Sequence, residues 1–265
     1  MIVTEGFDLL APGAATAFVL TAARVTGLTL VAPMFSARTM PIMLRTALVL
    51  LLSVLLQPVA RAHAPAAFAI TPGALVGELR VGFRVGFGAA LLIAGAEAAG
   101  ELLSVQVGLS GAALLDPLSL QQGTALGQFL HLFALTLLLA GNGHLVMLDS
   151  LAGTLQHVPI GSGMQLPNGL LETVLLGAQL FVLGFKFAAP VIAVVLIANV
   201  ALAVLSRAAP QLNILQLAFP LQIGLGLIAL TASIPVIAGW FVGWDVAYMD
   251  MVTRLVSALA GTGAR

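Results

Sequence analysis

Asp149, Ser150 and His157 offer the residue types of a Ser-His-Asp triad within one short segment. Such a triad works only when a sharp turn presents the serine and backbone N–H groups stabilise the oxyanion. The segment has no GxSxG turn, and the motifs GxxxxGK[ST], GxGxxG and HExxH are absent from the chain. We therefore interpret the combination as chance, and we expect no catalytic residues and no enzymatic activity.

The histidines do not form a pattern that binds metal. His131, His144 and His157 follow one another at intervals of 13 residues. A helix turns by about 220° over 13 residues, so these side chains would not share a face. Because the chain contains no cysteine, thiolate metal sites and disulfides are excluded. We expect neither a metal nor another cofactor.

Glu97 and Glu101 lie four positions apart within an apolar run. On a helix they would share one face, where like charges repel. Their short side chains cannot reach far along a helix toward water, so they need basic partners, protonation or local water. We assign them, together with Arg80 and Arg84, to polar contacts between subunits.

The composition identifies the class of protein. Apolar residues make up 60% of the 265-residue chain and charged residues 8%, and the mean hydropathy is +1.13. Soluble domains carry about 25% charged residues. Lysine plus arginine and aspartate plus glutamate each number 10, which leaves no positive surface for nucleic acid. The composition predicts an all-α, multi-helix integral membrane protein.

The charges are badly spaced for a simple bundle of lipid-facing helices. A membrane span needs about 20 apolar residues, but only about 12 residues separate Arg84 from Glu97, roughly 18 Å of helix. Snorkelling of Arg45, Arg61 and Lys186 to the interface is one explanation. The other is that much of the chain faces further protein subunits or an aqueous passage. Consecutive loops are both basic, so the positive-inside rule gives no orientation.

Apolar runs and turn residues predict long, kinked helices. Gly82 and Gly86 form a GxxxG pair, which would permit either a kink or an oligomer contact. The breaks are Ala32-Pro33, Gln57-Pro58 to Pro72, Asp116-Pro117, Gly141-Asn142-Gly143 and Pro159 to Pro167. The expected helices cover residues 11–31, 40–57, 72–106, 124–140, 144–157, 169–207 and 212–238, with a short amphipathic tail at 244–260.

The segment between Val107 and Gly123 is rich in small residues yet apolar for a solvated loop. At membrane depth, irregular backbone is tolerated where protein buries it or where it lines a cavity. The pattern predicts a re-entrant plug or constriction; an ordinary buried connector is the alternative. The residues of this predicted plug are Gly108, Leu109, Ser110, Gly111, Leu114, Leu115, Asp116 and Pro117.

A series of short motifs carries a resemblance to a known family. In chain order they are Gly100-Glu101, Gln106, Gly108-Leu109, Asp116-Pro117, Asn142-Gly143-His144, Pro159-Ile160-Gly161, Ala189-Pro190, Arg207, Ala209 to Ile214 and Phe219-Pro220-Leu221. By the order and spacing of these motifs the chain resembles the FliR/SctT family of type III secretion export-gate proteins over almost its whole length. The Asn-Gly-His and Pro-Ile-Gly motifs favour the flagellar branch; a virulence injectisome subunit is the alternative.

The resemblance implies an organisation of the chain. Residues 1–165 correspond to a FliP-like helical part that contains the plug loop, residues 108–122. Residues 169–238 correspond to a FliQ-like helical hairpin, and residues 244–265 form a tail. The elbow of the hairpin is carried by Arg207, Pro210, Gln211 and Asn213.

The resemblance also implies a function. A FliR-type subunit assembles with FliP and FliQ homologues, and with an FlhB homologue around them, in the bacterial inner membrane at the flagellar basal body. Unfolded flagellar proteins pass through this gate, and the plug seals it when idle. Leu109, Leu114 and Leu115 would occlude the passage, while Gly108 and Gly111 would provide backbone freedom. A stand-alone small-solute transporter is the rival, but it predicts inverted repeats and none is visible.

Overall fold

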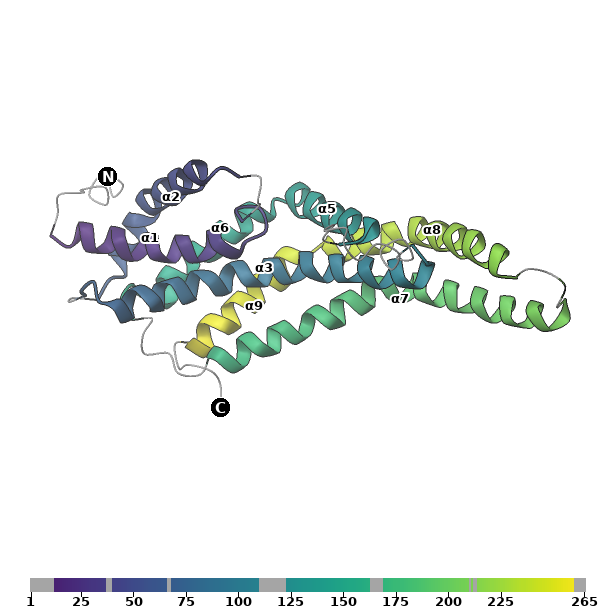
Figure 1. Ribbon diagram of the computed structural model, residues 1–265. Coiled ribbons are helices and arrows are strands. Elements are labelled where there is room, and N and C mark those ends of the chain that lie inside the picture. Colours follow the sequence, from purple (N-terminus) through teal and green to yellow (C-terminus); the bar gives the residue numbers. More distant parts are fainter. Residues whose placement is uncertain are drawn as a thin grey trace. The chain divides into compact units, whose positions relative to one another are not determined.

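All regular structure in the described part of the chain is helical. The computed structural model describes residues 12–36, 40–65, 68–109, 123–162, 169–209, 211 and 214–259. Its helices are labelled in Figure 1 and are α1 (Ala14–Val31), α2 (Ile42–Ala62), α3 (Pro72–Val107), α5 (Ala125–Ala140), α6 (Gly143–His157), α7 (Gly169–Ala208), α8 (Ile214–Phe241) and α9 (Trp244–Leu259). The predicted all-α fold with long helices is confirmed, and each predicted helix has a counterpart.

Several helices have the length and apolar character that a membrane span requires. Within the described residues there are five: α1, α2, α3, residues 180–208 of α7 and residues 216–239 of α8. Helices α5 and α6 are separated only by a bend at a short break and would together add a sixth, broken span. Asn142, at this bend, has a left-handed backbone with φ 56°, which asparagine adopts more readily than most residues.

The prediction that α2 ends before Pro58 is wrong, because the helix continues to Ala62. Pro58 removes one backbone hydrogen bond but has a helical φ. The face on either side of it remains packed, since Gln57 and Ala60 are buried and Gln57 Nε2 donates a hydrogen bond to the Ala14 carbonyl at 3.0 Å. Tertiary packing therefore maintains the helix where the local sequence favours a break.

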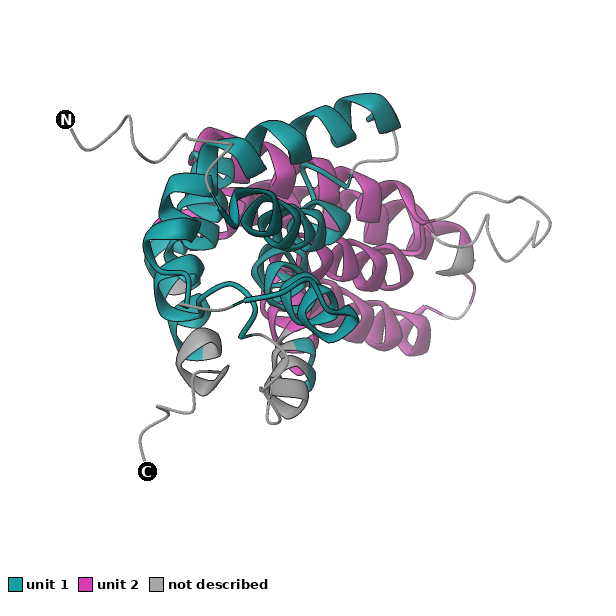
Figure 2. Ribbon diagram, turned by 90° about the vertical axis from the view of Figure 1, so that its left-hand side faces the viewer, with its two compact units in different colours: residues 1–91, 142–177, 243–265 teal, residues 92–141, 178–242 magenta. Residues whose placement is uncertain are grey.

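The contacts divide the chain into two compact units, which are coloured separately in Figure 2. Unit 1 contains Met1–Leu91, Asn142–Gly177 and Gly243–Arg265, and unit 2 contains Leu92–Gly141 and Ala178–Val242. Each unit thus combines segments that are far apart in the sequence. This is a division by packing, so the predicted division by resemblance to FliP and FliQ stays a prediction.

In unit 1, α1 lies beside the first half of α3 at the distance that glycine permits (Figure 1). A Cβ atom on Gly82 would overlap the carbonyl oxygen of Arg24, and one on Gly86 would come within 2.8 Å of the carbonyl oxygen of Leu28. The approach is reciprocal, since a Cβ atom on Gly27 would lie 2.8 Å from the backbone nitrogen of Phe83. The GxxxG pair therefore serves an approach of two helices within one chain.

The remaining helices of unit 1 complete its core. Helix α2 packs on α1 and α6, and α6 packs on α9. The hydroxyl of Tyr248 in α9 donates a hydrogen bond of 2.6 Å to the Val85 carbonyl of α3, and burial raises the pKa of this hydroxyl. One buried cluster joins Ala17, Leu20, Ala60, Ala74, Leu155 and Ile160.

In unit 2, small residues again bring helices together. A Cβ atom on Gly100 of α3 would come within 2.6 Å of the backbone nitrogen of Gly127 in α5. A Cβ atom on Gly95 would lie 3.0 Å from the Cβ of Leu183 in α7. Helix α5 also packs on α8.

Gly82→Ala should destabilise unit 1, because the new methyl group meets helix backbone that cannot move aside. We expect a loss of at least about 1–3 kcal/mol in the free energy of unfolding, as for other overpacked sites. The matched control is Gly153→Ala in α6, where nothing lies within 4 Å of the added Cβ. That variant should be neutral or gain up to about 1 kcal/mol from helix propensity. Thermal unfolding in detergent measures both, and equal melting temperatures would refute the tight α1–α3 contact.

Candidate functional site

A buried ion pair lies at the centre of unit 1. Nε of Arg24 in α1 is 2.6 Å from Oε2 of Glu78 in α3. Their side chains are 1% and 0% exposed, so no solvent screens the pair. A buried charge is tolerated only when it is paired and hydrogen-bonded, and both conditions are met here.

The other polar atoms of the pair bind a third region of the chain. Nη1 of Arg24 donates to Oγ1 of Thr154 at 3.1 Å, and Nη2 donates to the carbonyl oxygen of Val158 at 2.9 Å. Oε1 of Glu78 accepts a hydrogen bond from the backbone N–H of Gly161 at 2.8 Å. The pair therefore connects α1, α3, the end of α6 and the Pro159-Ile160-Gly161 turn.

Neither Arg24 nor Glu78 is among the site residues that the sequence predicts. The available signal was a lone positive charge, Arg24, in one apolar helix and the presence of acidic residues in a second. An ionisable residue in a membrane helix is expected to have a partner of opposite charge in a neighbouring helix. Without the α1–α3 contact, however, several acidic residues could have been chosen as the partner of Arg24.

A second polar group lies in unit 2, where α3 carries Glu97. Oε2 of Glu97 is 2.9 Å from Nδ1 of His131 in α5, and the two side chains are 48% and 38% exposed. The partner that the sequence required for Glu97 is thus a histidine. Because both groups are half exposed, they remain accessible to a further protein chain.

Glu101, one turn further along α3, binds the start of α5. Its Oε1 accepts a hydrogen bond of 2.8 Å from the backbone N–H of Thr124. Thr124 is the N-cap of α5, and its Oγ1 accepts hydrogen bonds from the Gly127 N–H at 3.1 Å and from the Ser104 hydroxyl at 2.7 Å. Unpaired N–H groups and the helix dipole make a helix N-terminus a favourable place for an anion. The repulsion expected between Glu97 and Glu101 is therefore offset by a different donor for each.

The two arginines predicted to make contacts between subunits differ in environment. Arg80 is exposed on α3, while Arg84, one turn later, is only 5% exposed. Of the four predicted contact residues, Arg80 and Glu97 are exposed, Glu101 is partly exposed and Arg84 is buried.

The predicted plug and the predicted hairpin elbow are only partly described. Gly108 and Leu109 follow the end of α3, and Gly108 has φ +83°. Arg207 lies in the last turn of α7 and is exposed, as is Gln211. The predicted residues outside the described part of the chain are Ser110, Gly111, Leu114, Leu115, Asp116, Pro117, Pro210 and Asn213.

Helices α7 and α8, which lie on either side of the predicted elbow, contact each other in unit 2. Gln222 of α8 donates a side-chain hydrogen bond to Asn199 of α7, and the rings of Phe187 and Phe241 stack with centroids 6.2 Å apart. Pro190 lies inside α7, and Pro220 and Pro235 lie inside α8.

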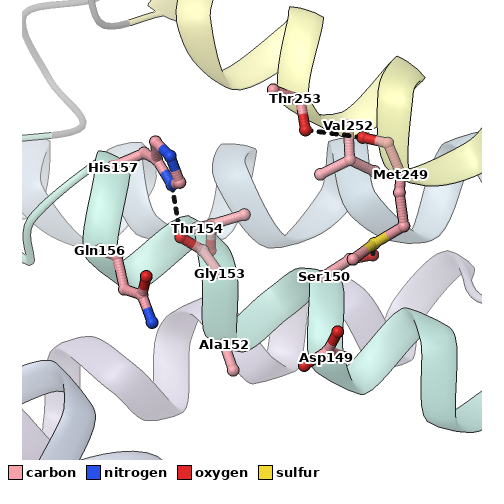
Figure 3. A pocket seen from close by; sticks show the side chains of 10 residues that line it. All are labelled: Asp149, Ser150, Ala152, Gly153, Thr154, Gln156, His157, Met249, Val252 and Thr253. Carbon is pink, nitrogen blue, oxygen red and sulfur yellow. Dashed lines mark hydrogen bonds between the residues drawn. The ribbon is translucent and has the colours of Figure 1, made fainter.

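A pocket of about 280 Å³ opens between α6 and α9 in unit 1, and Figure 3 shows its lining. It contains Asp149, Ser150 and His157, the residues of the chance triad. The hydroxyl of Ser150 donates to Sδ of Met249 at 2.9 Å, and Nδ1 of His157 donates to the Gly153 carbonyl at 2.9 Å. Serine and histidine thus have separate partners and do not activate each other.

Large apolar side chains cover the outer faces of the candidate spans. They include Ile42 and Met43 of α2, which are 77% and 84% exposed, and Phe181 of α7, which is 77% exposed. Side chains of this kind must be covered by lipid or by other protein chains, because contiguous apolar surface is unfavourable in water.

The sequence matches one protein family over most of its length. The matching profile is that of Bacterial export proteins, family 1, over residues 15–244. The flagellar biosynthetic protein FliR of Escherichia coli (strain K12) is 32% identical over 216 residues, which cover 81% of this chain and 83% of that protein. FliR of Caulobacter vibrioides is 29% identical over 219 residues (82% and 87%), and FliR of Bacillus subtilis is 31% identical over 165 residues (60% and 63%).

Breaking the buried pair on one side should be strongly destabilising. Arg24→Met leaves the Glu78 carboxylate buried without its cation, which typically costs about 3–5 kcal/mol. The double variant Arg24→Met/Glu78→Leu removes both charges, so its loss should be smaller than the sum of the two single losses. Thermal unfolding in detergent of the wild type, Arg24→Met, Glu78→Leu and the double variant gives the coupling energy between the two residues. Strictly additive losses of stability would contradict the pairing.

Proposed function

Because the chain belongs to the bacterial export proteins of family 1, the family of the flagellar biosynthetic protein FliR, we propose that it is a subunit of the flagellar type III export gate. In this proposal it forms, with FliP and FliQ homologues, the channel through which unfolded flagellar proteins leave the cell. The observation that carries the proposal is the family match over residues 15–244.

The distribution of charge supports an assembled gate over a subunit that faces lipid alone. Glu97 and His131 are half exposed on helices of membrane-spanning character, where lipid would leave them poorly solvated. A wall of partner subunits or an aqueous passage removes this difficulty. The exposed apolar faces of α2 and α7 provide the area on which such partners, or lipid, would pack.

The chain is a multi-pass membrane protein of the flagellar export family. We place it in the bacterial inner membrane at the flagellar basal body, in contact with an FlhB homologue and with unfolded flagellar cargo. Its relatives carry flagellar names, which favours this role over that of an injectisome subunit. The role needs no catalytic group, since the gate supplies a route and other components supply the energy.

The parts of the gate follow the predicted organisation. Residues 1–165 would take the FliP-like position, and residues 169–238, which contain α7 and α8, would take the FliQ-like position beside it. Residues 108–122 would form the plug. Small and apolar residues suit this role, because they pack tightly when closed and offer no specific pocket when cargo passes.

Deletion of residues 110–115 should make the assembled gate leak. Without the occluding leucines the channel would conduct ions at rest, so purified gate complexes in planar bilayers should show increased conductance. The control is Thr136→Val on the exposed side of α5, whose hydroxyl donates to the Leu132 carbonyl of its own helix. Unchanged conductance in a fully assembled deletion complex would contradict the plug assignment.

Reversal of an exposed charge should weaken assembly. In Arg80→Glu the contact proposed for α3 becomes repulsive, so less FliP and FliQ should co-purify with the tagged chain. Arg254→Glu on α9 is the matched control, because that side chain is 80% exposed and its surface pair with Asp250 contributes little. Purification of the tagged wild-type chain alone or as a homo-oligomer would instead favour a stand-alone transporter.

A further inference from the structure

The junction between α3 and α5 in unit 2 contains a compact group of polar contacts, which we call the clasp. It consists of Glu101 and Ser104 on α3 and Thr124 at the start of α5. Glu101 and Ser104 are three positions apart and share a helix face. Their oxygens reach the backbone N–H and the hydroxyl of Thr124 at 2.8 Å and 2.7 Å. Both polar groups of one residue are therefore held by one turn of another helix.

The position of the clasp in the chain is as informative as its contacts. Helix α3 ends at Val107, and α5 begins at Ala125. The clasp therefore joins the last turns before residues 110–122 to the first residues after them. Gly108 and Gly123, which flank those residues, have φ of +83° and +94°, a conformation that glycine adopts at little cost.

The backbone around the clasp leaves little space for rearrangement. A Cβ atom on Gly127 would collide with Oε1 of Glu101 and lie 3.1 Å from its Cδ. A Cβ atom on Gly100 would lie 2.6 Å from the Gly127 nitrogen. The two glycines thus allow the carboxylate to reach the helix start, where the dipole of α5 favours its negative charge.

We propose that Glu101 is a positioning residue: together with Ser104 and Thr124 in the clasp, it fixes both ends of the chain segment from 109 to 123. The contacts of the clasp persist during export, so α3 and α5 do not separate when cargo passes. This inference rests on the proposed function, because the segment contains the plug. It assigns Glu101 a role within its own chain in place of the predicted contact between subunits.

The absence of native cysteine makes a direct test possible. In Ser104→Cys/Thr124→Cys the new sulfurs replace hydroxyls 2.7 Å apart, so they are placed to form a disulfide. If the clasp stays intact during export, gates in which the two cysteines form a disulfide should export cargo as fast as gates with the reduced cysteines. The two single-cysteine variants should export at the same rate. Export that stops on oxidation and returns on reduction would overturn the inference, because α3 and α5 would then have to separate.

A second test replaces Glu101, whose carboxylate accepts the hydrogen bond from Thr124. Glu101→Ala removes a charge-assisted hydrogen bond, and resting conductance of the assembled gate should rise roughly tenfold or more. Glu101→Gln retains an oxygen that can accept from the Thr124 N–H, so it should restore much of the seal. Thr124→Val should leak, whereas Thr136→Val on the same helix should not. A purely structural defect would instead lower the yield of assembled complex without raising conductance per complex.

The outcomes separate this inference from the proposed function. If deletion of residues 110–115 leaks but Glu101→Ala and Thr124→Val seal like the wild type, the plug stands and the clasp is refuted. If the deletion also seals, the plug assignment itself fails. If Glu101→Ala does not assemble, Thr124→Val and the cysteine pair decide the question. The inference is supported if Glu101→Ala and Thr124→Val both leak and if oxidation of the cysteine pair leaves export unchanged.

Discussion

The ion pair between Arg24 and Glu78 is the interaction on which the arrangement of unit 1 depends. Two charges in an apolar interior are tolerated only if the helices that carry them stay in register, because a shift would leave each charge unpaired at a cost of several kcal/mol. The same pair also binds Thr154, Val158 and Gly161, so the register of α1 and α3 fixes the end of α6. A purely apolar contact would permit sliding, and this one does not.

Glycine is the second half of that constraint. The pair can form only because Gly82 lets the backbone of α3 approach the carbonyl of Arg24. Unit 2 repeats the combination, since Gly100 and Gly127 bring α3 and α5 close enough for Glu101 to reach the start of α5. In both units a carboxylate on α3 crosses a contact between small residues and binds a polar group on another element. Close packing at glycine therefore allows each carboxylate to reach the group that compensates its charge.

This combination of close packing and charge compensation fits the proposed function, in which a subunit of an export gate must hold its position around a passage. Buried or capped carboxylates give α3 fixed positions relative to α1 and α5. The pair of Glu97 and His131 and the apolar outer faces of α2 and α7 are exposed, so other protein chains or lipid can contact them. Polar contacts between helices inside the protein and apolar side chains on its surface are consistent with the proposed role as a subunit of a membrane assembly.

The sequence alone determined the fold class, the order of the helices and the family, because hydrophobic runs, turn residues and ordered short motifs are local signals. It also identified Glu97 and Glu101 as groups that need partners. Only the tertiary structure decided which partners those are, that Arg24 pairs with Glu78, and that the helix through Pro58 continues. These outcomes depend on which residues meet across long sequence distances. Close approach at glycine and the cost of burying an unpaired charge decide which of these long-range contacts form. Neither can be predicted from a single segment of the sequence.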